Sequence, residues 1–170
     1  MDPLIVTLEV DPASDARFQA ARRRWFPLHR QQVPAHVTLF HKLPGEDVVA
    51  VAGRLEDVAA AHAPLPFRVT AVMPLGRAGA AFRLEVPGLR AVRSQIARGF
   101  ELAPQDRGGG RPHVTIQNKV APAVAAAVLQ RLQAGFAPWE GTGTGLALWR
   151  YRGGPWEAAG AWRFAGAPDG

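Results

Sequence analysis

Apolar residues along the chain either alternate with polar ones or recur every three to four positions, and these two patterns divide it into short strands and helices. Alternating runs rich in branched and aromatic residues predict strands, and helical spacing predicts amphipathic helices. The predicted strands span residues 4–10, 35–43, 66–75, 80–86, 112–119, 145–152 and 156–164. The predicted helices span residues 15–26, with Ser14 as N-cap, 47–62, 89–102 and 123–132.

Several successive strands are joined by short turns, which favours an antiparallel or mixed sheet and an α+β fold. The whole chain, residues 1–170, has the length of a single domain. Glycine clusters at 108–110 and 141–145 precede predicted strands and lack a following helix with a Lys-Ser/Thr pair. We therefore interpret them as loops or strand starts rather than as phosphate-binding loops.

The amino-acid composition limits the catalytic groups and the partners that the chain can have. The chain has no cysteine, which excludes thiol nucleophiles, disulfides and cysteine-ligated zinc. Its formal charge of +6 comes from 18 Arg and two Lys against 14 acidic residues, a balance that favours anionic partners such as nucleic acid. The run 22–24 of three arginines is typical of a solvated helix face, although it could also track RNA. With no apolar run long enough for a membrane span and no signal peptide, we expect a cytoplasmic monomer without a membrane partner.

Two seven-residue segments share one pattern, HVTLFHK at 36–42 and HVTIQNK at 113–119. The two lysines in them are the only lysines of the chain, and two accidental His-x-Thr triplets have a likelihood on the order of one in a hundred. Strand alternation would place four residues of each segment on one face. These residues are His36, Thr38, Phe40 and Lys42 in the first segment, and His113, Thr115, Gln117 and Lys119 in the second.

Such a pair of strands suits the opening of a cyclic phosphodiester. One imidazole can take a proton from water while the other gives a proton to the leaving oxygen, since the unperturbed pKa of histidine is about 6.5. Thr38, Thr115 and the two lysines can donate to the phosphate oxygens from both sides. We therefore predict His36, Thr38, His113 and Thr115 as catalytic residues, with no metal and no cofactor.

Aromatic and cationic side chains near these motifs are candidates for substrate binding. Alternation in the last hairpin places Trp149 and Tyr151 opposite the core face, where they and Phe40 could stack a base, although core packing of Trp149 is an equal alternative. By the same strand alternation, Arg83 in the fourth predicted strand could reach the substrate-binding side. His41 falls on the face opposite His36, so we expect it to pack against neighbouring residues or to support a catalytic side chain. A zinc site that includes His41 is disfavoured.

The paired motifs, with the flanking stretches RRRWFP, PAHVTLFHKLPG and RPHVTI, resemble the two-histidine phosphoesterases, in particular the bacterial 2'-5' RNA ligase-like branch. The resemblance implies a duplicated ferredoxin-like fold: two pseudo-symmetric, intertwined lobes of mostly antiparallel sheet with outer helices and a central cleft. It also implies that one lobe carries His36 and Thr38 and the other His113 and Thr115.

Within that resemblance, we expect the substrate to be RNA or a nucleotide ending in a 2',3'-cyclic phosphate, opened to a 2'-phosphate. The same site could act reversibly on 2'-5' linkages as an RNA ligase. An ADP-ribose cyclic phosphodiesterase and a non-catalytic nucleotide- or RNA-binding module are the alternatives. The sequence leaves open which histidine is the base.

Overall fold

The computed structural model describes residues 2–167, which form a mixed fold of helices and antiparallel strands, so the predicted α+β class is confirmed. The strands are β1 (Leu4–Val10), β2 (Val37–Leu43), β3 (Leu65–Leu75), β4 (Gly79–Glu85), β5 (His113–Gln117), β6 (Trp139–Arg150) and β7 (Glu157–Arg163). The α-helices are α1 (Pro12–Trp25), α2 (Val48–Ala61), α3 (Leu89–Ala97), α4 (Pro104–Arg107) and α5 (Pro122–Ala134), with 3-10 turns at Leu28–Arg30 and Gly45–Asp47.

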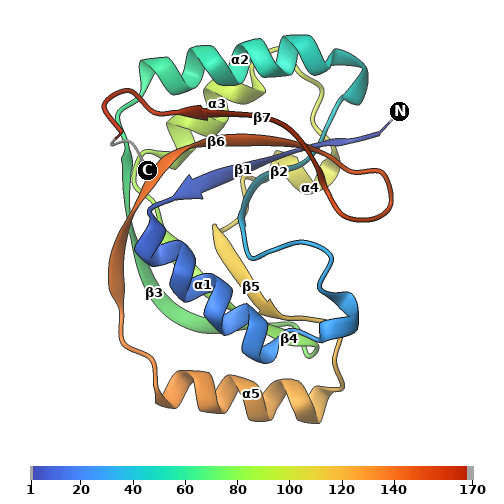
Figure 1. The fold of residues 1–170 in the computed structure, drawn as a ribbon, viewed down its shortest axis with the longest axis vertical. Helices are drawn as coiled ribbons and strands as arrows, with labels where there is room; N and C mark the ends of the chain where they lie inside the picture. Colours follow the sequence, from blue (N-terminus) through green and yellow to red (C-terminus); the bar gives the residue numbers. More distant parts are fainter. Residues whose placement is uncertain (1, 168–170) are drawn as a thin grey trace.

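One sheet runs through the described part of the chain in the order β2-β1-β6-β3-β4-β5, and β7 pairs with β6. The first part of β6 pairs with β3 and its later part with β1 and β7, with Gly143 opposite residues of both β1 and β3. The two halves of the sheet carry different helices: α5 packs on β3 and β4 and α1 beside β5, whereas α2 packs on β7 and β6 (Figure 1). β6 thus joins the two halves.

The helix α1 begins at Pro12, earlier than predicted, because Asp11 rather than Ser14 is its N-cap. The Asp11 carboxylate accepts hydrogen bonds from the backbone N–H groups of Ser14, at 3.0 Å, and Thr142, at 2.8 Å. A carboxylate at this position satisfies a free helix donor and complements the helix dipole. Ser14 itself is buried.

Other boundaries differ from the prediction where tertiary packing sets them. β6 begins at Trp139, so the second glycine cluster lies inside a strand and not in a loop. At Gly145 a side chain would collide with the backbone of Trp162 on β7, which explains why a glycine occupies this position. α3 ends at Ala97, and the short helix α4 was not predicted. Within residues 2–167, no helix is long and apolar enough to cross a membrane.

Candidate active site

The two strands that carry the repeated motif stand at opposite ends of the strand order, yet they contact each other. β2 is one edge of the sheet and β5 is the other. Because the sheet twists and curls, these edges meet near the middle of the molecule (Figure 1). His36 directly precedes β2 and His113 is the first residue of β5, so the curl brings the starts of both motif strands into one region.

A β-bulge follows the first motif. Thr38 is paired with Thr7 on β1, and the next paired residue is Phe40, opposite Val6, so Leu39 has no partner in the ladder. The extra residue reverses the side-chain alternation. Phe40 is therefore fully buried instead of sharing the face of the histidine, which disfavours stacking of a base on its ring, and its role in substrate binding stays a prediction.

The second motif has the same bulge at the same offset. Thr115 is paired with Ala81 on β4 and Gln117 with Ala80, which leaves Ile116 without a partner. Gln117 is only 3% exposed, and within the described residues its Oε1 atom has no hydrogen-bond partner. The same reversal buries Gln117 instead of placing it on the face of His113, and its role in substrate binding stays a prediction. The two motifs share not only their letters but this backbone irregularity.

Both histidines are held in one tautomer by the same local contact. Nδ1 of His36 lies 2.7 Å from the carbonyl oxygen of Pro34, and Nδ1 of His113 lies 2.9 Å from that of Arg111. A carbonyl oxygen only accepts, so Nδ1 carries the proton in each ring. Nε2 is then the atom through which each imidazole can exchange a proton with a ligand.

His36 lies in an environment that favours the neutral imidazole. Burial lowers its pKa from 6.5 to about 4; the hydrogen bond to Pro34 acts in the opposite direction, and the nearby Arg22, His41 and His113 lower the pKa further. The Trp156 ring covers it, with ring centroids 4.5 Å apart.

A pocket of about 530 Å³ adjoins His36 and is walled partly by tryptophan. Trp149 donates its indole N–H to Oγ1 of Thr7 at 3.0 Å, and Trp156 lies 6.1 Å from it between ring centroids. Trp149 therefore lines this pocket, whereas Tyr151 is 43% exposed just past the end of β6. Trp156 was not predicted as a site residue, although an aromatic residue directly after the Gly-Gly-Pro turn of a hairpin that carries Trp149 is a usable signal.

The predicted cationic residues fall in different places. Arg83 is paired with His113 across β4 and β5, so both side chains leave the same face of the sheet, and its Nε atom lies 3.4 Å from Oγ1 of Thr70. Lys42 is exposed near the end of β2. Lys119 lies beyond the end of β5 with a φ of 59°, so the predicted extension of this strand to residue 119 is wrong.

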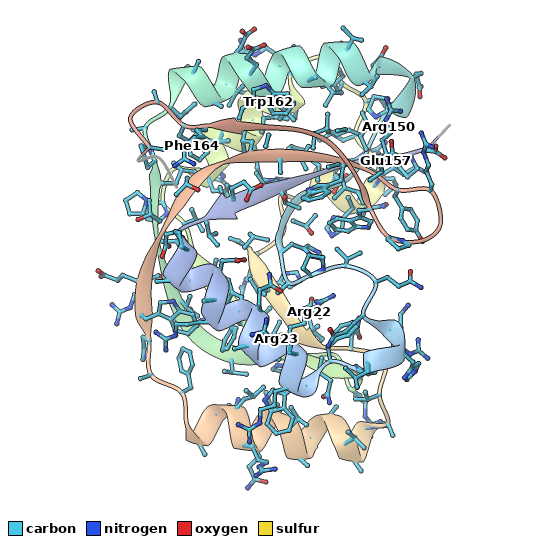
Figure 2. The ribbon with its side chains drawn as sticks, in the orientation of Figure 1. Arg22, Arg23, Arg150, Glu157, Trp162 and Phe164 are labelled. Carbon is cyan, nitrogen blue, oxygen red and sulfur yellow. The ribbon has the colours of Figure 1, made fainter. Side chains whose placement is uncertain are left out.

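Arg22 of α1 ties the two motif segments together. It donates from Nη1 to the carbonyl of Thr115 at 2.8 Å and from Nη2 to the carbonyl of Val33 at 3.0 Å. Its guanidinium also lies 3.9 Å above the Phe26 ring, and burial lowers its pKa to about 10. The expected solvated helix face therefore holds for Arg23 but not for Arg22, although both leave the same helix beside β5 (Figure 2).

Asp106 of α4 holds the outer edge of β2 in a comparable way. Its buried carboxylate accepts from the backbone N–H groups of His41 and Lys42, both at 2.8 Å, and lies 3.0 Å from Nδ1 of His41. Arg93 of α3 donates to the carbonyls of Leu39 and Asp106, both at 3.0 Å. The supporting role predicted for His41 is a contact to Asp106, a residue that no sequence pattern marked.

The site thus contains two imidazoles whose Nε2 atoms have no hydrogen-bond partner among the described residues. A half-buried threonine follows each histidine by two residues, and arginines hold the motif strands by hydrogen bonds to their carbonyl groups. Among the described residues, no group of three or more His, Asp or Glu side chains is arranged to hold a metal ion. An arrangement of this kind can move a proton onto one side of a phosphate and off the other.

Comparison with known proteins agrees with this geometry. Residues 10–155 match the 2'-5' RNA ligase superfamily, and no curated protein matches the chain. TT0787 of Thermus thermophilus is 18% identical with a TM-score of 0.66, covering 96% of this chain and 98% of its own. LigT of E. coli in complex with NADP+ is 15% identical with a TM-score of 0.59 and the same coverages. Usb1 of Kluyveromyces marxianus is 15% identical with a TM-score of 0.50, covering 86% of this chain and 92% of its own.

The chain combines a curled antiparallel sheet with a His-x-Thr motif at each edge, and this combination defines it as a two-histidine phosphoesterase. The chain belongs to the 2'-5' RNA ligase superfamily.

Proposed function

We propose that this protein opens 2',3'-cyclic phosphates of RNA or nucleotides to 2'-phosphates, using His36 and His113 as an acid-base pair and no metal. The observation that carries the proposal is the matched pair of histidines, each with Nδ1 held by the carbonyl two residues earlier and Nε2 left for the substrate. Thr38 and Thr115 would donate to the non-bridging phosphate oxygens. The predicted cytoplasmic location and monomeric state stay predictions.

In the hydrolytic direction, His36 would be the base. Its lowered pKa keeps Nε2 unprotonated at neutral pH, which is the form that can take a proton from water. The water oxygen would attack phosphorus as the bond from phosphorus to the 3' oxygen breaks, and the leaving oxygen would take a proton from Nε2 of His113. The product would keep its phosphate on the 2' oxygen. The same steps with a 5'-hydroxyl in place of water would form a 2'-5' linkage, and their reversal would cleave that linkage to the cyclic phosphate and a free 5'-hydroxyl.

Structural relatives support a nucleotide-like ligand. LigT of E. coli has been crystallised with 3'-AMP, with ATP and with NADP+. The pocket beside His36 offers stacking surfaces for a base, namely the predicted Trp149 together with Trp156.

The test is turnover, in the presence of EDTA, of a 2',3'-cyclic mononucleotide and of a short RNA ending in a 2',3'-cyclic phosphate. His36→Ala and His113→Ala should each lower kcat by about 100-fold or more, as expected when a general acid or base is removed. His29→Ala, which changes an exposed histidine, is the matched control.

Loss of wild-type activity on chelation would contradict a metal-free mechanism. Turnover of an ADP-ribose cyclic phosphate in place of both substrates would favour the small-molecule alternative. Nucleotide binding without any turnover would favour the binding module.

A further inference from the structure

A second, larger cavity lies beside His113, away from the tryptophan-lined pocket. It measures about 840 Å³, within the roughly 300–1,000 Å³ of typical ligand pockets. β4, α3, α4 and the loop 108–112 form its walls. Its most notable chemical feature is five arginines, namely Arg83, Arg90, Arg93, Arg107 and Arg111.

The charge in this cavity is not neutralised by its own walls. Two carboxylates also line it, those of Glu85 and Asp106. The Asp106 carboxylate already accepts two backbone N–H groups and the His41 contact. Within residues 2–167, none of the five arginines takes part in an ion pair. The cavity therefore keeps an excess of positive charge, which favours an anion with more than one charged group.

Not all five arginines have the same freedom. Arg93 is committed to two carbonyl groups and to the Phe40 ring, 4.6 Å from its guanidinium. Arg90 on α3 and Arg107 on α4 are exposed, and within residues 2–167 Arg107 donates through Nε alone, to the carbonyl of Leu102 at 2.9 Å. Their remaining N–H groups are available to a ligand that enters from solvent.

The cavity adjoins the candidate catalytic site through two of its arginines. Arg83 is the cross-strand partner of His113, and Arg111 supplies the carbonyl that holds Nδ1 of the same histidine. One wall is the Gly108–Gly110 loop, which has no side chains to fill the space, and a side chain at Gly109 would meet Nη1 of Arg93. A phosphate beside His113 would thus lie next to two of the arginines that line the cavity.

We propose that this cavity binds the backbone phosphates of an RNA strand next to the cyclic phosphate, so that the preferred substrate is an oligoribonucleotide. This inference rests on the proposed function. A cyclic mononucleotide has one phosphate, which the histidines and threonines engage, and so it leaves the arginines without a partner. A strand continues with one diester phosphate per nucleotide, which matches a row of cationic groups leading away from the reacting centre.

Binding gives the first test. A fluorescein-labelled tetraribonucleotide ending in a 2'-phosphate, the expected product, is titrated against wild type and against Arg90→Ala/Arg107→Ala by anisotropy. Arg24→Ala/Arg131→Ala, which removes the same charge from α1 and α5, is the control. We expect the Kd to rise about tenfold in the cavity variant and less than about twofold in the control. The slope of log K against log salt should fall by about 1.4, near 0.7 for each lost phosphate contact on a single strand.

Turnover gives the second test and separates this inference from the proposed function. In the cavity variant, kcat/KM should fall about tenfold for a tetraribonucleotide ending in a 2',3'-cyclic phosphate, through KM, and should stay within about twofold for the cyclic mononucleotide. Normal turnover of the mononucleotide also shows that the variant is folded.

Equal losses on both substrates, or no loss on the tetranucleotide, would overturn the inference while leaving the phosphodiesterase intact. A loss confined to an ADP-ribose cyclic phosphate, whose diphosphate offers similar chemistry, would also overturn it. If wild type turned over nothing but the cavity variant still lost oligonucleotide affinity and salt dependence, the inference would stand and the proposed activity would fall.

Discussion

The ionisation of His36 can be measured directly, and it tests whether Trp156 shields this imidazole from water. Burial under Trp156 lowers the pKa of His36 from 6.5 to about 4, with Arg22, His41 and His113 contributing in the same direction. Since one pKa unit corresponds to about 1.4 kcal/mol, the folded protein favours the neutral ring by on the order of 3 kcal/mol. Trp156→Ala would open the ring to water and should raise this pKa by at least about one unit, because desolvation is the largest cause.

The sign of the pH dependence follows from the lowered pKa. Between pH 6.5 and about 4 the unfolded chain binds a proton at His36 and the folded chain does not. The free energy of unfolding should therefore fall as the pH drops through this window, and it should fall less in Trp156→Ala. The acid limb of kcat/KM in wild type should likewise lie below pH 6.5 and move upward in the variant.

The assay is a titration of the imidazole signals by NMR, with His36 assigned from the signal missing in His36→Gln. Tyr151→Ala, in the same connection between β6 and β7 but without a contact to His36, is the control and should leave the titration unchanged. A wild-type pKa of 6 or above would contradict the burial of His36, and the same pKa with and without the Trp156 ring would contradict the shielding by Trp156.

Three further predictions concern the groups that hold the site. Arg22→Met should lower the free energy of unfolding by about 2–4 kcal/mol and reduce turnover, because two carbonyl groups lose their donors, whereas Arg23→Met should change stability by less than about 0.5 kcal/mol. Urea unfolding of the two variants compares them, and equal values would show that the buried contacts contribute little. Asp106→Asn places an amide N–H₂ against backbone donors and should cost about 2–3 kcal/mol, measured against Gln105→Ala, and a cost no larger than that of the control would contradict the clamp on β2. Gly79→Ala would force a side chain into the backbone of β5 and should cost about 2–3 kcal/mol or more, so a thermal midpoint equal to wild type would mean that the strands can separate there freely.

Much of the fold and the central pair of motifs could be predicted because each rests on a local pattern. The branched, apolar run LIVTLEV corresponds to a strand that is buried from Leu4 to Leu8, and the helix predicted over residues 47–62 corresponds to α2, which buries Val51, Leu55 and Val58. The His-Val-Thr repeat marked both motif strands, and the curl of the sheet brings their starts together. These signals lie within a few residues of the positions they describe.

The errors have a common physical origin in contacts between distant segments. Strand parity failed at Phe40 and Gln117 because a bulge, which no residue type announces, reversed the alternation after each threonine. The start of β6 was missed because its glycines are there for close approach to other segments, not for a turn. Arg22 and Asp106 resemble ordinary surface residues in sequence, and only their carbonyl and amide partners far along the chain explain their burial.

The long strand β6 has a consequence for how such a site can change over time. Since one unbroken strand pairs with β1, the neighbour of β2, and with β3, which leads through β4 to β5, we expect its bend to set the gap between the two imidazoles. A substitution at Gly141 or Gly143, which touches neither histidine, could widen or narrow that gap by altering the bend alone. The span of substrate that the two rings accept can then be tuned by mutations remote from the chemistry, while the proton-transferring groups themselves stay untouched.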